Sequence, residues 1–232
     1  MTQVITGLSS MATRVLLAEL SDELWRTHEL ALAFESGGGV AVAQQVREGA
    51  AADLLVLAED AMAKLDAEGH LVPGTLRALF ASDVVAAVPM SGCSTDAPGL
   101  DTEDDLRTLL VSAERIAYST GPSGTALVDL ISRWSLAEVL DDRLVQAPPG
   151  VPVGTLLAEG QAALGFQQFS ELKDNPGVRV LGPLPGDARI RSIFSGAVLA
   201  HSGQQDAAAD ALALLAAPEV SPLVVAAGLA PA

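Results

Sequence analysis

The first third of the chain alternates apolar runs of strand length with stretches whose apolar residues recur at the helical period. We predict strands at residues 3–10, 30–36 and 52–58, each followed by a helix, at residues 10–28, 40–49 and 59–69. Gly49 stands where a helix commonly ends in a left-handed glycine. This order of elements predicts a parallel sheet with right-handed helical crossovers.

The alternation continues to the end of the chain. We predict further strands at residues 82–90, 115–119, 142–148, 161–168, 178–185 and 191–200, and helices at 102–112, 121–140, 151–160, 204–220 and 221–232. No long linker and no tandem repeat interrupts the pattern. The fold class is therefore α/β.

Composition supports buried sheets covered by helices. Half of the chain is apolar but only 3% is aromatic, so Ala, Val and Leu must build the core. Mean hydropathy is +0.38. No run reaches the roughly 18 uninterrupted apolar residues of a membrane helix, so we expect no membrane insertion.

Charge excludes one class of partner. Thirteen Lys and Arg face 29 Asp and Glu, a net charge of −16. Neutralising a phosphate backbone requires clustered Lys and Arg, so we expect no nucleic-acid partner. A small anion can still bind through backbone N–H groups.

The sequence indicates no metal site and no cofactor. Cys93 is the single cysteine, and His28, His70 and His201 are scattered. The start of the chain lacks the basic and apolar segments of a signal peptide. We expect a cytoplasmic monomer as the sequence is written, or a periplasmic one if an export signal has been removed.

Three predicted strand-to-helix turns are rich in small and hydroxylated residues. At such turns the helix N–H groups and hydroxyls can converge on an anion. The alternative is ordinary helix capping and turn formation, for which Ser, Thr and Gly are common. The candidates are Ser9 and Ser10 in the first turn, Ser36, Gly37 and Gly38 in the second, and Ser123, Gly124 and Thr125 in the third.

Other glycine-rich motifs do not fit. The turn at residues 36–39 is followed by no Gly-Lys-Ser/Thr, which excludes a P-loop. The first turn lacks the three-glycine spacing of a dinucleotide site. The stretch 121–125 has the wrong spacing for a Gly-x-Ser-x-Gly nucleophile elbow.

Two stretches resemble the periplasmic molybdate-binding proteins. Residues 5–20, ITGLSSMATRVLLAEL, are similar to that family's opening, and Gln45 to Leu57 match its Gln-to-Ala-Asp run more specifically. The resemblance implies a type II periplasmic-binding fold of two α/β lobes, joined by two crossing strands, with a ligand cleft between them. We expect one lobe from residues 1–82 and 195–232, and the other from 83–194.

The resemblance also implies site residues. Ser10 matches the family's first-turn serine, and a backbone contact falls at Val153. Glycines 37–39 stand where the family has serines, and Gln168 stands where it has a ligand-touching tyrosine. These departures favour an organic acid bulkier than a compact oxyanion, because glycines make room and an amide can donate or accept.

Two functions follow from the resemblance. One is reversible anion binding by a solute-binding protein, with an ABC transporter permease as partner if the protein is exported. The alternative is an isomerase similar to aconitate isomerase, which moves a double bond in a tricarboxylate by a proton shift. That reaction needs an acid or base beside the ligand. Glu35 is the leading candidate if it is not simply a solvated strand-end charge.

Three weaker candidates for this role each have a plainer interpretation. Tyr118 can be a packed aromatic residue, Arg191 can pair with Asp187 at the surface, and His201 can be an exposed loop residue.

Overall fold

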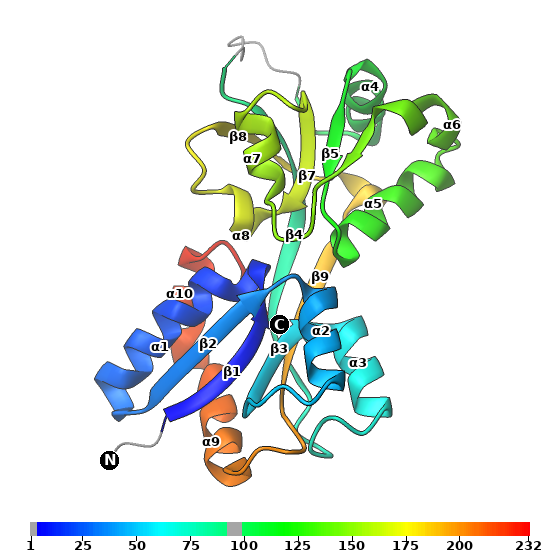
Figure 1. Cartoon of the computed structure of the whole chain (residues 1–232). Helices are drawn as coiled ribbons and strands as arrows, with labels where there is room; N and C mark the ends of the chain where they lie inside the picture. Colours follow the sequence, from blue (N-terminus) through cyan, green and yellow to red (C-terminus); the bar gives the residue numbers. More distant parts are fainter. Residues whose placement is uncertain (1–3, 92–98) are drawn as a thin grey trace. The chain divides into compact units, whose positions relative to one another are not determined.

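The computed structural model describes residues 4–91 and 99–232, so Cys93 lies outside the described residues. The chain divides into two compact units (Figure 1). Unit 1 comprises Met1–Ser82 and Ile193–Ala232, and unit 2 comprises Asp83–Ser192. The division falls inside two strands, β4 (Arg77–Pro89) and β9 (Arg191–Val198).

The sheet of unit 1 has a parallel centre. Strand β1 (Val4–Ser10) lies between β2 (Ala31–Gly37) and β3 (Leu54–Ala58), and both neighbours run parallel to it. Strand β9 pairs antiparallel with β3. The register places Ser9 opposite Ser36 and Ser10 opposite Gly37, so the carboxyl ends of β1 and β2 are level.

Helices cover both faces of this sheet (Figure 1). Their leucines are fully buried, for example Leu16, Leu17 and Leu20 on one face and Leu65 on the other. Full burial of such a side chain contributes about 1.5–3 kcal/mol. One face carries η1 (Met11–Thr13), α1 (Arg14–His28), α9 (Gln205–Leu215), η4 (Pro218–Val220) and α10 (Ser221–Ala226); the other carries α2 (Gly39–Arg47) and α3 (Glu59–Ala67).

The sheet of unit 2 is mixed. Strand β5 (Ile116–Tyr118) pairs in parallel with β6 (Leu144–Gln146) and β7 (Leu164–Gln168). Strand β4 pairs antiparallel with β7 and with β8 (Val178–Pro183). One face packs against α4 (Glu103–Ser112), α5 (Pro122–Arg133), α6 (Ala137–Leu140) and η3 (Gly186–Ala188), with η2 (Asp141–Arg143) following α6; the other packs against α7 (Val153–Ala158) and α8 (Phe169–Leu172).

Local signals explain several helix ends. Thr102 and Asp105 form a reciprocal capping box at the start of α4, which satisfies two otherwise unpaired N–H groups. Gly49 has φ +83 just after α2, as the sequence predicts.

Three predicted helices were too long. The helix expected at 204–220 ends at Leu215, and Pro218–Val220 forms the separate turn η4. The helix expected at 121–140 breaks after Arg133, where Ser135 adopts φ 58 before α6 begins. The last predicted helix ends at Ala226, because the chain then pairs as the short strand β10 (Ala230–Pro231) against β4.

Among the described helices, none alone has the length and apolar character to cross a membrane. By length and composition alone, a pair bent by 51°, Gln205–Leu215 with Pro218–Ala226, meets that criterion. The inner face of α9, including Leu212 and Leu215, packs into the core of unit 1.

Candidate functional site

Two hydroxyl groups meet at the carboxyl ends of β1 and β2. Ser9 Oγ and Ser36 Oγ are 2.7 Å apart, and either can donate the hydrogen bond. Ser9 is fully buried, whereas Ser36 is only half-buried. Ser9 therefore holds Ser36 in place, and Ser36 is the hydroxyl that a ligand can reach.

Ser10 is also largely covered, at 8% exposure. Its Oγ lies 3.5 Å from Thr13 Oγ1, the outer limit of a hydrogen bond. Thr13 Oγ1 in turn donates to the Ser10 carbonyl oxygen at 3.2 Å. The first predicted turn thus has a weakly engaged hydroxyl at Ser10, whose side chain alternates away from that of Ser9 at the end of β1.

The glycine turn between β2 and α2 is open. A Cβ atom built on Gly38 or Gly39 meets nothing within 4 Å, and one on Gly37 meets only Val42 Cγ2 at 3.1 Å. Gly38 has φ −61 and ψ 129, which any residue adopts. Neither backbone conformation nor crowding requires glycine at position 38, so the turn leaves free space beside Ser36.

Glu35 lies on the other side of β2. Side chains alternate along a strand, so Glu35 points to the face opposite that of Phe34 and Ser36. It is exposed. The structure therefore separates the leading acid–base candidate from the hydroxyl pair, although the two are adjacent in sequence.

The weaker acid–base candidates are accounted for by local contacts. Tyr118 packs against the core of unit 2. Arg191 lies 4.0 Å from the Asp83 carboxylate, which corrects the predicted pairing with Asp187. His201 is exposed, and its Nε2 is 2.7 Å from the Ala50 carbonyl oxygen.

The third turn, in unit 2, is tightly built. Ser119 Oγ and the buried Ser123 Oγ are 2.8 Å apart. A Cβ on Gly124 would collide with the Ser119 carbonyl oxygen, so only glycine fits there without movement. The N–H groups of Gly124 and Thr125 both donate to the Gly121 carbonyl, at 3.0 and 3.2 Å, and the Thr125 side chain is exposed.

The predicted backbone contact at Val153 is taken by a side chain. The Val153 N–H donates to Gln167 Oε1 at 2.8 Å, and Gln167 Nε2 donates to Glu171 Oε1 at 2.8 Å. Gln167 is 4% exposed. Sequence reasoning missed it, although two glutamines closing a buried strand were a visible signal.

Gln168 has an unused hydrogen-bonding atom. It is 3% exposed, and its Nε2 donates to Ser192 Oγ at 2.7 Å. Its Oε1 is buried and has no hydrogen-bond partner among the described residues. Turning the amide over would make the unused atom a donor instead. A buried polar atom of this kind is costly unless something binds it.

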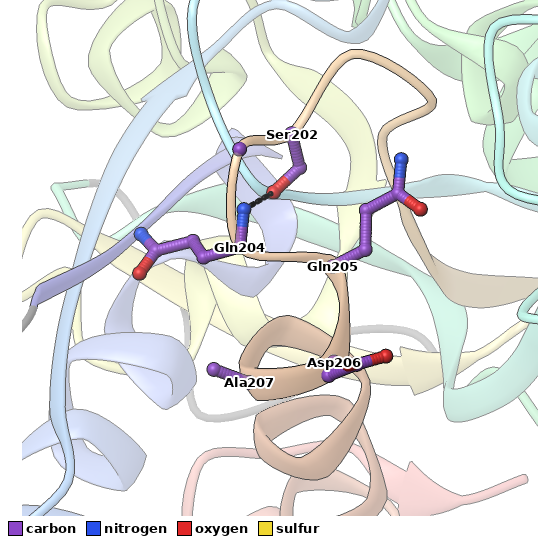
Figure 2. A pocket seen from close by; sticks show the side chains of 6 residues that line it. Ser202, Gln204, Gln205, Asp206 and Ala207 are labelled. Atoms are coloured by element: carbon purple, nitrogen blue, oxygen red, sulfur yellow. Dashed lines mark hydrogen bonds between the residues drawn. The ribbon is translucent and has the colours of Figure 1, made fainter.

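A hollow of about 500 Å³ lies at the start of α9 (Figure 2). It is lined by Ser202, Gly203, Gln204, Gln205, Asp206 and Ala207. Lacking Lys and Arg but holding one carboxylate, this lining is unsuited to an anion. It also lies at the amino end of β3, away from the Ser9–Ser36 pair, because β9 runs antiparallel to β3 and ends there.

Beneath this hollow, Asp53 ties three segments together. Its carboxylate accepts hydrogen bonds from the Thr6 N–H (2.9 Å) and hydroxyl (3.0 Å), the Ser202 hydroxyl (2.7 Å) and Gln204 Nε2 (2.8 Å). Burial by itself would raise the pKa of Asp53, but these hydrogen bonds outweigh it and leave the pKa below its ordinary value. The network holds β1, the start of β3 and the segment before α9 together.

Across residues 4–91 and 99–232, no three His, Cys, Asp or Glu side chains gather in an arrangement able to hold a metal ion.

Comparison with known proteins assigns this chain to a family. The family model described as "Bacterial extracellular solute-binding protein" matches residues 5–230. An aconitate isomerase from Pseudomonas sp is 32% identical over 184 residues, which are 78% of this chain and 68% of that protein.

Solved structures show the same fold. The periplasmic molybdate-binding protein of Azotobacter vinelandii superimposes with a TM-score of 0.79 at 20% identity, covering 97% of this chain and 98% of that one. The sulfate-binding protein SubI of Mycobacterium tuberculosis H37Rv gives a TM-score of 0.80 at 15% identity, covering 99% and 87%. The predicted type II periplasmic-binding fold is confirmed.

Proposed function

We propose that this chain, which belongs to the family of bacterial extracellular solute-binding proteins, binds a small anion reversibly. The donors would be hydroxyl and amide groups at the carboxyl ends of the strands in each unit. Such groups stabilise an anion without the desolvation cost of a buried ion pair.

One observation carries the proposal. The Ser9–Ser36 hydroxyl pair stands beside a glycine turn that has free space at positions 38 and 39 and no structural need for glycine at 38. Open space at the end of a parallel sheet, with hydroxyl and helix N–H donors beside it, suits a bound anion.

In unit 2, the unpartnered amide atom of Gln168 supports the same proposal. An amide that can present either a donor or an acceptor suits a ligand carrying carboxylate or hydroxyl groups. We therefore favour an organic carboxylate over a compact tetrahedral oxyanion. The contributions of Ser123, Gly124, Thr125 and Val153 stay predictions, as does the placement of the ligand between the two units.

As part of this proposal, the protein acts outside the cytoplasm and delivers its ligand to an ABC transporter permease. Its support is the matched family, which is extracellular by description.

Calorimetric titration would test the binding. We expect the purified protein to bind a tricarboxylate such as tricarballylate more tightly than sulfate or molybdate. Gln168→Met should weaken tricarballylate binding; its effect on stability should be small, because it removes both an unpaired buried oxygen and the hydrogen bond to Ser192. If none of these anions binds, the proposal fails.

A second candidate is an isomerase of a small unsaturated polycarboxylate. The observation that favours it is the 32% identity to an aconitate isomerase, higher than the identity to the molybdate- and sulfate-binding structures. In such a reaction a base removes a proton from one carbon, the double bond shifts, and a proton returns to another carbon.

Incubation with trans-aconitate, followed by NMR, would test this candidate. Conversion that is lost in Glu35→Gln would assign the base. Conversion that persists in this variant would mean that another residue is the base, as expected if Glu35 points away from Ser36. Binding without conversion would leave only the solute-binding function.

A further inference from the structure

A second hollow, of about 290 Å³, opens beside Ser36 in unit 1. Helix α1 lies along strand β2 here (Figure 1). From the strand come Leu32, Phe34 and Ser36, which alternate onto one face. From the helix come Arg14, Ala18, Ser21 and Asp22, whose spacing also places them on one face.

Arg14 is the only cation of this lining. Within residues 4–91 and 99–232, its side chain has no hydrogen bond or ion pair, unlike Arg26, which is bound to Glu23, and Arg47, which is bound to Glu68. Asp22 lies two helical turns further along α1, about 12 Å away along the axis. The cation is thus left free in a protein with more than twice as many acids as bases.

The position of Arg14 is not explained by helix stability. It is the first residue of α1, and the first turn of that helix contains no acid. A cation near the start of a helix is unfavourable with respect to the helix dipole. Arg14 is exposed and gains no helix stability from this placement.

The lining of this hollow suits a carboxylate at one end and an apolar carbon chain along one side. A guanidinium binds a carboxylate through two parallel hydrogen bonds. Phe34 and Leu32 offer apolar contact to a carbon chain, while the Asp22 carboxylate repels an anionic group from the far end. A negatively charged group is therefore confined to the end where Ser36 and Arg14 lie.

We propose that Arg14 is a specificity-determining residue that binds a second carboxylate of a ligand held at Ser36. The ligand class is then a di- or tricarboxylate with an apolar carbon backbone. This inference rests on the proposed function and narrows its ligand. Sequence reasoning missed Arg14, because a single arginine at a helix start forms no motif.

The test compares full-length wild type with Arg14→Gln by calorimetry, using tricarballylate and sulfate. We expect Arg14→Gln to raise the Kd for tricarballylate at least tenfold and to change that for sulfate less than twofold. Arg14→Lys should recover part of the affinity, since it restores the charge without the planar fork. Thermal unfolding should show an unchanged or raised Tm for Arg14→Gln.

Arg133→Gln is the matched control, because Arg133 is an exposed arginine at the end of α5 in the other unit and its loss changes net charge equally. Equal effects of the two substitutions on tricarballylate would overturn the inference, as would equal losses for tricarballylate and sulfate in Arg14→Gln. If wild type binds tricarballylate and Arg14→Gln binds it as well, the inference alone fails. If wild type binds neither anion, the proposed function fails with it.

Discussion

Ser9 holds Ser36 by a hydroxyl-to-hydroxyl contact of 2.7 Å, across two parallel strands whose register sets them side by side. Ser9 is inaccessible and Ser36 is half-buried. The buried Ser9 hydroxyl therefore fixes the orientation of the Ser36 hydroxyl, and of the two only Ser36 is accessible to a ligand.

Ser36→Ala should weaken tricarballylate binding by about 1 kcal/mol, roughly fivefold, because it removes one neutral hydrogen bond to the ligand. Ser9→Ala should weaken it less, since the ligand-facing hydroxyl remains. Ser132→Ala is the control: the exposed Ser132 hydroxyl donates to the Val128 carbonyl on α5. Calorimetry measures all three, and equal affinities in Ser36→Ala and wild type would contradict the assigned role.

Gly38→Ser should have opposite effects on stability and on ligand affinity. Gly38 is the N-cap of α2 with an extended backbone, and a Cβ built there meets nothing within 4 Å, so serine fits without strain. A serine should raise the free energy of unfolding by a few tenths to about 1 kcal/mol, through capping and a less flexible unfolded chain.

The same substitution fills space beside Ser36. We expect tricarballylate affinity to fall more than sulfate affinity, because the larger ligand needs that space. Urea unfolding and calorimetry on one preparation measure both effects. A variant with increased stability and unchanged affinity for both anions would show that the open turn has no part in binding.

Gly124→Ala should destabilise the protein by about 1–3 kcal/mol, the usual cost of overpacking a tight site. The added methyl group would meet the Ser119 carbonyl oxygen at the turn before α5. Gly121→Ala is a matched control three residues away, since a Cβ there meets nothing within 4 Å. Urea unfolding would distinguish them, and similar midpoints for the two variants would show that the turn adapts.

The sequence predicts the fold well where hydrophobic period and turn chemistry agree. Strands β1 and β2, which carry Ser9 and Ser36 near their carboxyl ends, were predicted because apolar runs stop at polar residues, and Gly49 marked the end of its helix. The break after Arg133 was missed because neither Gly nor Pro marks it. Ser135 adopts a left-handed conformation that sequence alone gives no reason to expect.

The candidate site is less predictable, because its details depend on which face each side chain occupies. Alternation along β2 already separates Glu35 from Phe34 and Ser36, and applying it would have weakened Glu35 as a base. By contrast, the capture of the Val153 N–H by Gln167 depends on a side-chain rotamer, which no spacing rule gives.

Asp53→Asn should lower the free energy of unfolding by about 2 kcal/mol at pH 7, because hydrogen bonds to a carboxylate are stronger than those to a neutral amide. The pKa of Asp53 is lowered in the folded state by its bonds to Ser202, Thr6 and Gln204, which outweigh the effect of burial. Its stabilising contribution is therefore fully present above the unfolded pKa, about 3.9. It is lost as pH falls through the lower, folded value.

Urea unfolding of wild type and Asp53→Asn from pH 7 to pH 3 would measure this dependence. The gap between the two proteins should stay constant down to about pH 5 and then narrow. Asp129→Asn removes the same charge from an exposed position on α5 and should leave the free energy of unfolding near that of wild type at pH 7. A gap between wild type and Asp53→Asn that widens on acidification would mean that Asp53 is more easily protonated in the folded protein, the reverse of what its four hydrogen bonds imply.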